Sequence, residues 1–266
     1  MLFRSWPTFP GGYNPDFGAD ITDFSAVAGI RGDWTDDFSY DITVRVAENE
    51  VEYTLGETIN PSLGALSPTS FKPGTLIQEE AGLNIDFVKS YETGNLAFGF
   101  EWRNETYEIE VGDLASRQVG PTAAIFGLGS DGFQGFPVES DDDWESDSFA
   151  AYIDAEYDVS AEFKIAVAFR YEDYKEFADS TSDFKVAGRY QINDTTAVRA
   201  TYNTSFRIPT PGQVNTLNVT TTSDSSGNLI PNGTYPVDHP IAVARGSRAL
   251  EAEDADSFTK IGRAHV

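Results

Sequence analysis

Apolar and polar residues alternate strictly along much of this chain. Between residues 149 and 157 the odd positions are apolar, while the even positions include Asp154 and Glu156. The runs over 163–171, 184–190 and 198–202 repeat this alternation. A period of two residues is typical of β-strands with one apolar face, and no window longer than about ten residues keeps the spacing of an amphipathic helix. The pattern predicts an almost all-β fold.

The apolar faces of these runs have aromatic ends. In each of the first three runs an aromatic residue stands at both ends of the apolar face, with aliphatic or small residues between them. The face from Phe163 to Tyr171 extends about 26 Å along the strand, and strand tilt reduces this to about 20 Å along a barrel axis. The lipid-facing band of an outer-membrane barrel is about 25 Å tall and has aromatic girdles at both interfaces. We therefore expect a transmembrane β-barrel in which Val167 and its face contact outer-membrane lipid.

The connections between the predicted strands alternate between short and long. Short turns are expected near 34–37, 92–94, 160–161 and 193–195, and longer connections near 57–79, 112–145, 175–180 and 207–254. An antiparallel up-and-down barrel with short periplasmic turns and long extracellular loops has this alternation. The strands number about eight, with a ninth starting near Ala255, which favours an open segment of a larger barrel. Residues 1–260 are expected to form this partial barrel.

Composition excludes several classes of function. The chain has 43 acidic and 18 basic residues and a formal charge of -25, so we expect no nucleic-acid partner. Cysteine is absent and the two histidines are His239 and His265, which leaves few groups for catalysis, so we expect no enzyme. The acidic run 139–145 offers oxygen ligands for Ca²⁺ but lacks the spacing and turn glycine of a calcium loop. We interpret it as a solvated loop and expect neither a metal site nor a cofactor.

Both ends of the chain have unusual sequences. No secretory signal precedes the loop-like segment that follows Trp6. The last six residues, 261–266, correspond to a translation of ATC GGA AGA GCA CAC GTC, which resembles a common short-read sequencing adapter. We therefore expect the natural sequence to end, in this read, near Lys260, with His265 carrying no biological meaning.

Five segments of the chain resemble one protein family in order and spacing from about residue 80 to 258. They are GNLAFGFEWRNE at 94–105, GFQGFP at 132–137, AFRYEDY at 168–174, FRIPTPGQ at 206–213 and ALEAE at 249–253. This set is similar to the barrel motifs of TonB-dependent receptors. Ile208 and Ala252 depart from the family pattern, which has Ala and Pro there, and put the local loop conformation in doubt.

The resemblance implies an outer-membrane receptor of a Gram-negative bacterium. Such a receptor takes up a scarce nutrient, such as a siderophore, cobalamin or a carbohydrate, with energy delivered through TonB to a plug domain that is not visible in this sequence. Lumen-facing arginines could contact carboxylates of the plug or the ligand, although pairing with lumen acids such as Asp154, Glu156, Glu172 and Asp183 is the commoner arrangement. The candidates are Arg103, Arg170, Arg189 and Arg199.

Two other interpretations stay open at the level of sequence. A passive porin-like channel uses the same kind of strand without TonB coupling, and a plug domain in the full gene would distinguish the two. A secreted β-sandwich that binds carbohydrate through Trp and Tyr faces is a rival of another class. Partition into detergent or lipid separates a membrane barrel from such a sandwich.

Overall fold

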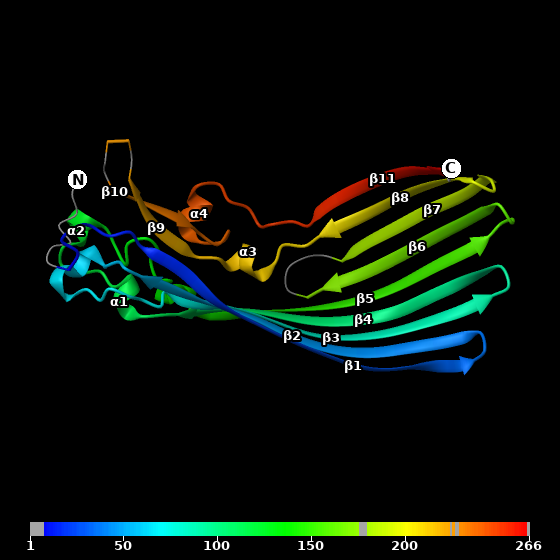
Figure 1. The fold of residues 1–266 in the computed structure, drawn as a ribbon, viewed down its shortest axis with the longest axis horizontal. Helices are drawn as coiled ribbons and strands as arrows, with labels where there is room; N and C mark the ends of the chain where they lie inside the picture. The colour runs from blue at the N-terminus through cyan, green and yellow to red at the C-terminus, as the bar shows by residue number, and fades with distance from the viewer. Residues whose placement is uncertain (1–7, 176–179, 224, 227–228, 265–266) are drawn as a thin grey trace.

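A computed structural model describes residues 8–175, 180–223, 225–226 and 229–264 of the chain. Within these ranges one nine-stranded antiparallel sheet dominates, and every strand except the last pairs with the strand before it in sequence (Figure 1). Its strands are β1 (Asp16–Thr35), β2 (Phe38–Gly56), β3 (Gly74–Tyr91), β4 (Gly94–Val111), β5 (Asp142–Asp158), β6 (Phe163–Tyr174), β7 (Thr181–Asn193), β8 (Thr196–Arg207) and β11 (Glu253–Ala264). The expected all-β, up-and-down architecture is confirmed.

The sheet is curved but not closed. In the described residues β1 pairs only with β2 and β11 pairs only with β8, so both edges of the sheet are free. The short turns gather at one end of the sheet and the long connections at the other (Figure 1). We refer to these as the short-turn end and the loop end. Apart from one two-stranded hairpin, the described strands form this one sheet, so the described part of the chain is not a two-layer sandwich.

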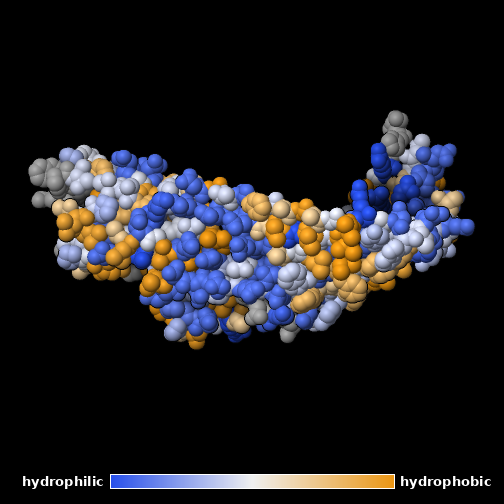
Figure 2. Space-filling model, turned by 90° about the horizontal axis from the view of Figure 1, so that it is seen from below, coloured by the Kyte–Doolittle hydropathy of each residue, from blue (hydrophilic) through white to orange (hydrophobic). Residues whose placement is uncertain are grey.

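Strand register places the apolar residues of neighbouring strands on one face. Phe98 pairs with Ile153, Ile153 with Phe169, and Phe169 with Phe184, so one continuous row crosses four strands. Three of these large hydrophobic side chains are exposed, namely Ile153, Phe169 and Phe184, and Val167 on the same face is 45% exposed. Figure 2 shows hydrophobic residues forming a band across the strands toward the short-turn end. Exposure of such a large apolar face is what contact with lipid requires.

The polarity of the faces is exchanged toward the loop end. On β2 the outward face continues from Val46 to Glu48, Glu50 and Glu52, whereas the inward face there carries Leu55, which is 1% exposed. Figure 2 shows hydrophilic residues between the hydrophobic band and the loop end. Water rather than lipid therefore surrounds this part of the sheet. The acidic run 139–145 was expected to lie in a loop. Only its first three residues do, because β5 starts at Asp142.

Two loop-end connections, 57–73 and 112–141, pack together on the inward face. Leu55, Phe71, Ile109 and Phe136 are each at most 6% exposed and form a small apolar core. Asn60 joins the connections, since its Nδ2 donates hydrogen bonds to the carbonyls of residues 115 and 118 at 2.8 and 2.9 Å. The short helices here are η1 (Pro61–Leu66), α1 (Leu114–Arg117), α2 (Ala123–Phe126) and η2 (Val138–Ser140). A buried polar group needs such partners, so Asn60 fixes the two connections to each other.

The connection between β8 and β11 has its own structure. It contains α3 (Pro211–Asn215), the two-stranded hairpin β9 (Asn218–Ser223) and β10 (Leu229–Thr234), and α4 (Pro240–Ala244). Thr210 and Gln213 cap α3 reciprocally, since each side chain hydrogen bonds with the backbone of the other residue. Among the described residues, no helix has the length and apolarity needed to cross a bilayer.

Some expected boundaries were wrong by several residues. β3 begins at Gly74, inside the predicted 57–79 connection, and β11 begins at Glu253, just before the predicted Ala255. Most of the 175–180 connection, the beginning of the chain through residue 7, and His265 lie outside the described residues. The proposed division at residue 260 stays a prediction. In the structure β11 runs through this position, and residues 261–264 pair in register with β8.

Candidate functional site

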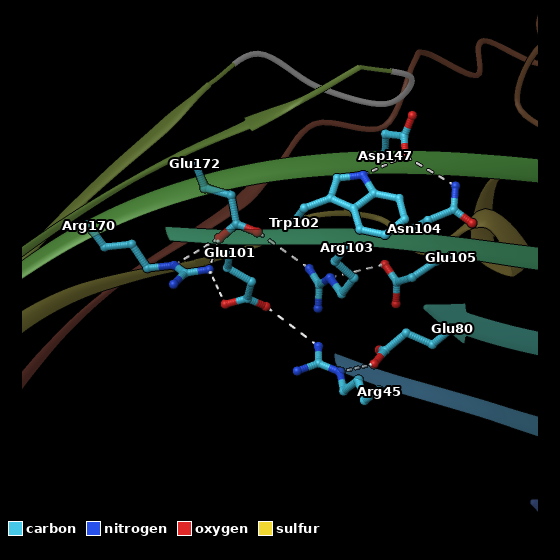
Figure 3. Close-up of polar contacts among 10 residues, drawn as sticks. All are labelled: Arg45, Glu80, Glu101, Trp102, Arg103, Asn104, Glu105, Asp147, Arg170 and Glu172. Atoms are coloured by element: carbon cyan, nitrogen blue, oxygen red, sulfur yellow. Dashed lines mark hydrogen bonds and ion pairs between the residues drawn. The ribbon is translucent and has the colours of Figure 1, made fainter. Parts of the chain in front are cut away.

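Charged side chains form a connected network on the inward, concave face of the sheet. Strand alternation places them there, since they occupy the positions between the lipid-facing residues. Arg45 Nε lies 2.5 Å from Glu80 Oε1, and Arg45 Nη2 lies 3.5 Å from Glu101. Arg170 Nη2 lies 3.1 Å from Glu101 and 2.8 Å from Glu172 (Figure 3). The network therefore joins β2, β3, β4 and β6 across the inner wall.

Glu172 is the most buried member of this network. Its side chain is 4% exposed and lies between Arg170 and Arg103, whose Nη2 is 3.5 Å away. Arg103 Nε also lies 3.8 Å from Glu105, which is too far for a hydrogen bond (Figure 3). A buried carboxylate with two guanidinium partners is compensated in charge, and these arginines are held in place by it. Arg103 and Arg170 are thus engaged by the wall itself.

Arg189 and Arg199 have different surroundings from the first two candidates. They stand directly opposite each other on β7 and β8, so two positive charges are neighbours across the strands. Arg189 donates a hydrogen bond to Gln191, and no carboxylate in the described residues forms an ion pair with either arginine. The structure thus divides the four predicted arginines into two that are paired with wall acids and two that form no ion pair within the described residues. We call Arg189 and Arg199 the open pair.

A second inward contact involves the glycine of the 94–105 segment. Tyr152 Oη donates a hydrogen bond of 2.6 Å to Asp86 Oδ1, and the two residues meet over Gly99. A Cβ at Gly99 would lie 2.6 Å from both Tyr152 Cε1 and Asp86 Oδ1. Glycine is therefore required for this close approach.

On the outward face, Trp102 lies at the edge of the apolar band that is nearer the loop end. Its Nε1 donates a hydrogen bond of 3.1 Å to Asp147, which also accepts from Asn104 (Figure 3). An aromatic ring with an apolar body and one polar contact is typical of a membrane interface. Trp102 therefore places the boundary between lipid and water on β4.

At the loop end, Tyr13 donates a hydrogen bond of 2.8 Å to Asp131 Oδ2. Burial and the neighbouring Asp131 carboxylate raise the pKa of Tyr13 above its usual value, so this phenol stays protonated. An open hollow of about 540 Å³ nearby is lined by β1, β2 and residues including Lys72 and Asp113. The described residues contain no cluster of three or more His, Cys, Asp or Glu side chains suited to a metal ion.

Sequence reasoning identified part of this inner wall. Pairing of inward arginines with lumen acids was considered, and it is confirmed for Glu172 with Arg103 and Arg170. Glu156 and Asp183 pair otherwise, with Lys164 and Thr204. Arg45, Glu80 and Glu101 were missed as network members. Their positions in the alternation signalled an inward face, but only the register shows that they meet.

Comparisons with known proteins agree with a β-barrel fold. The family model described as "TonB dependent receptor-like, beta-barrel" matches residues 3–259. A search of curated proteins gave no match.

Three similar solved structures have the same type of fold. The siderophore receptor PirA from Acinetobacter baumannii has a TM-score of 0.61 at 12% identity, over 93% of this chain and 33% of that chain. PirA from Pseudomonas aeruginosa has 0.51 at 13%, over 95% and 47%. The RagAB peptide transporter has 0.50 at 13%, over 92% and 28%. This chain thus spans less than half the length of each. Identities this low support the fold alone.

The family model covers nearly the whole chain, and the fold, the exposed apolar face and the charged inner wall agree with it. The chain therefore belongs to the TonB-dependent receptor family, as part of its β-barrel.

Proposed function

We propose that this chain is part of an outer-membrane receptor that carries out energised uptake of a scarce nutrient, such as a siderophore, cobalamin or a carbohydrate. The observation that carries the proposal is the division of one sheet into a lipid-type face and a charged inner wall. A lumen lined with charged groups suits passage of a polar solute, whereas the exposed apolar face suits the bilayer. Family membership supports a receptor or transporter rather than an enzyme.

The energised mechanism needs parts outside residues 1–266. The plug domain and the segment that contacts TonB belong to the remainder of the receptor in this proposal. Two of the similar structures are siderophore receptors, and the third is a peptide transporter. These likenesses support uptake of a nutrient and leave its chemical class to experiment.

The proposal is tested with the complete gene in a strain that lacks its own receptors for the nutrients. Cells are given iron as a panel of ferric siderophores, or labelled cobalamin, or maltodextrins, and uptake is measured with and without TonB. We expect saturable uptake of one class that disappears when TonB is deleted. Uptake that continues without TonB would instead identify a passive channel. No uptake of any probe by a correctly inserted barrel would contradict the proposal as stated.

Among the four candidate arginines, the open pair Arg189 and Arg199 is the better candidate for contact with plug or ligand. Arg103 and Arg170 already bind Glu172, so an external carboxylate would have to compete with it. We propose that Arg103 and Arg170 keep the wall in register. The open pair has no such competitor in the described residues.

A further inference from the structure

The connection that follows β8 turns inward and crosses the concave face of the sheet. Its first helix, α3, contacts β4 and β5, although β5, β6 and β7 separate β8 from β4 (Figure 1). At the usual strand spacing this separation is about 19 Å along the wall, and an extended chain from Arg207 to Gly212 spans at most about 18 Å. Residues 207–212 therefore run nearly straight across the face. We call residues 206–216, which include α3, the crossbar.

The sequence of the crossbar favours this straight path. Pro209 and Pro211 are both buried, and a proline keeps the residue before it extended. Thr210, which stands between them and caps α3, has a φ of -74° and a ψ of 154°. At the start of the crossbar the Phe206 ring meets Tyr174 of β6 edge-on, with the ring centroids 6.0 Å apart. The crossbar is thus held in place by β6 before it reaches β4.

The other end of the crossbar docks on an aromatic pair. Tyr107 and Trp144 stand directly opposite each other on β4 and β5, with their ring centroids 6.0 Å apart. Gly212 lies so close to the Tyr107 ring that a Cβ there would be 3.3 Å from Tyr107 Cζ. The Thr216 hydroxyl is close enough to the Tyr107 phenol to interact with it. A large side chain at position 212 would push α3 off the rings, so glycine permits the docking.

The crossbar lies between the loop end and the charged network of the inner wall. Counted from the loop end, Tyr107 precedes Glu105 and Arg103 on β4, and Tyr174 precedes Glu172 on β6. A solute that enters the lumen along these strands therefore meets the crossbar before it meets the charges.

We propose that the crossbar is a fixed restriction of the lumen, which stays docked on Tyr107 and Trp144 during uptake and limits the width of the solutes that reach the charged network. This inference rests on the proposed function and adds a determinant of solute size to it. A lid that opens would need slack in the chain and weak contacts at its far end. The crossbar has neither, because its chain is extended to nearly its full reach and both of its ends pack on aromatic rings.

The first test measures access to the wall below the crossbar. Glu105→Cys supplies a reporter thiol in the full-length receptor on intact cells, since Glu105 is 24% exposed and residues 1–266 contain no cysteine; cysteines elsewhere are replaced by serine. The thiol is labelled from outside with a small methanethiosulfonate or with a maleimide that carries a long polyethylene glycol chain. Gly212→Leu displaces the crossbar. Gly56→Leu is the matched control, because a Cβ at this loop-end glycine would meet nothing within 4 Å.

We expect the small reagent to label every variant and the large one to react about tenfold faster once Gly212→Leu has displaced the crossbar. Gly56→Leu should react like the parent receptor. Heat-modifiable migration on a gel confirms that each barrel is folded. If Gly212→Leu does not fold, Thr216→Val, which removes the interaction with Tyr107, is read instead. Equal labelling by the large reagent with and without the displacement would overturn the proposal, and so would a thiol that no reagent reaches in any variant.

The second test fixes the crossbar to the wall. Gly212→Cys with Tyr107→Cys are joined by a short bifunctional thiol reagent, and uptake of the ferric siderophores, labelled cobalamin and maltodextrins is compared before and after joining. We expect uptake after joining to be no slower than before. Uptake that stops on joining would show that the crossbar has to move, which contradicts a fixed restriction. A receptor that takes up none of these probes but shows the size-dependent labelling would contradict the proposed function and leave the restriction intact.

Discussion

At the scale of single residues, the inner wall is stabilised by compensated charge. Glu172 is almost completely buried, while its partners Arg103 and Arg170 keep 25% and 33% of their side chains exposed. Solvent screens the arginines more than the carboxylate, so the pairs are worth less than fully buried ones. Removing the carboxylate charge would nevertheless leave Arg170 with only Glu101, at 3.1 Å, and Arg103 with only Glu105, at 3.8 Å, as anionic partners.

Glu172→Gln should therefore destabilise the barrel. We expect a loss of about 1–3 kcal/mol in the free energy of unfolding, because two ion pairs are replaced by weaker hydrogen bonds between a guanidinium and a neutral amide. The measurement is reversible denaturant unfolding of the full-length receptor in lipid. Glu105→Gln is the matched control, since Glu105 is 24% exposed and 3.8 Å from Arg103, and it should cost well under about 1 kcal/mol. Equal losses in the two variants would remove the special role of Glu172.

Gly99 offers a second residue-scale prediction. Gly99→Ala places a Cβ 2.6 Å from Tyr152 Cε1 and 2.7 Å from the Ile85 carbonyl oxygen, so backbone or ring must move. We expect destabilisation of about 1–3 kcal/mol from this overpacking. Gly188→Ala is the control, because its nearest heavy atom is a Phe163 ring carbon at 3.5 Å. Unfolding curves that place Gly188→Ala below Gly99→Ala in stability would contradict this explanation of the glycine.

At the scale of strands and loops, the sequence predicted an element well where the two-residue alternation of apolar and polar residues covers the whole strand. The run from Phe163 to Tyr171 could be assigned to a strand, to a face and to a membrane environment by alternation alone. The start of β3 was missed because the polarity of its faces is exchanged near Glu79, so the lipid-type pattern ends before the strand does. Likewise the acidic residues from Asp142 to Glu145 were assigned to a loop, although they continue β5 into water.

Contacts between distant elements were beyond sequence reasoning. Nothing in the spacing of Asn60 predicts that it binds carbonyls of residues 115 and 118, because that contact depends on how two separate connections fold over the sheet. The same holds for Arg45 with Glu101, which meet only through the register of three strands. Fold class and face were therefore predictable, whereas the partners of each charge were not.

The register of β6 can be tested by a pair of adjacent substitutions. Val167 faces outward and is 45% exposed, so Val167→Arg puts a charge into the bilayer midplane and should cost about 2–4 kcal/mol. Ala168 faces inward between Asp154 and Lys185, where an arginine can reach the Asp154 carboxylate or water, so Ala168→Arg should cost much less. Denaturant unfolding in lipid measures both. A greater cost at Ala168 would reverse the assignment of lipid and lumen faces.

At the scale of the whole molecule, the two ends of the sheet should lie on opposite sides of the outer membrane. Single cysteines in place of Glu139 and Ser225, both exposed at the loop end, should react with an impermeant thiol reagent on intact cells. Cysteines in place of Asp36 and Ala161, both exposed at the short-turn end, should react only after the cells are opened. Ser140 is unsuited to this test because it is 1% exposed. Labelling of all four positions, or the inverse pattern, would contradict the topology.

The acidic outward surface above the apolar band determines how far the receptor reaches from the cell. On β2 the strand continues beyond Val46 to Gly56, which at the usual rise and tilt amounts to about 25 Å of wall standing above the lipid. That height exceeds the thickness of the lipid headgroup layer, so the loops would meet nutrients in water, clear of the membrane surface.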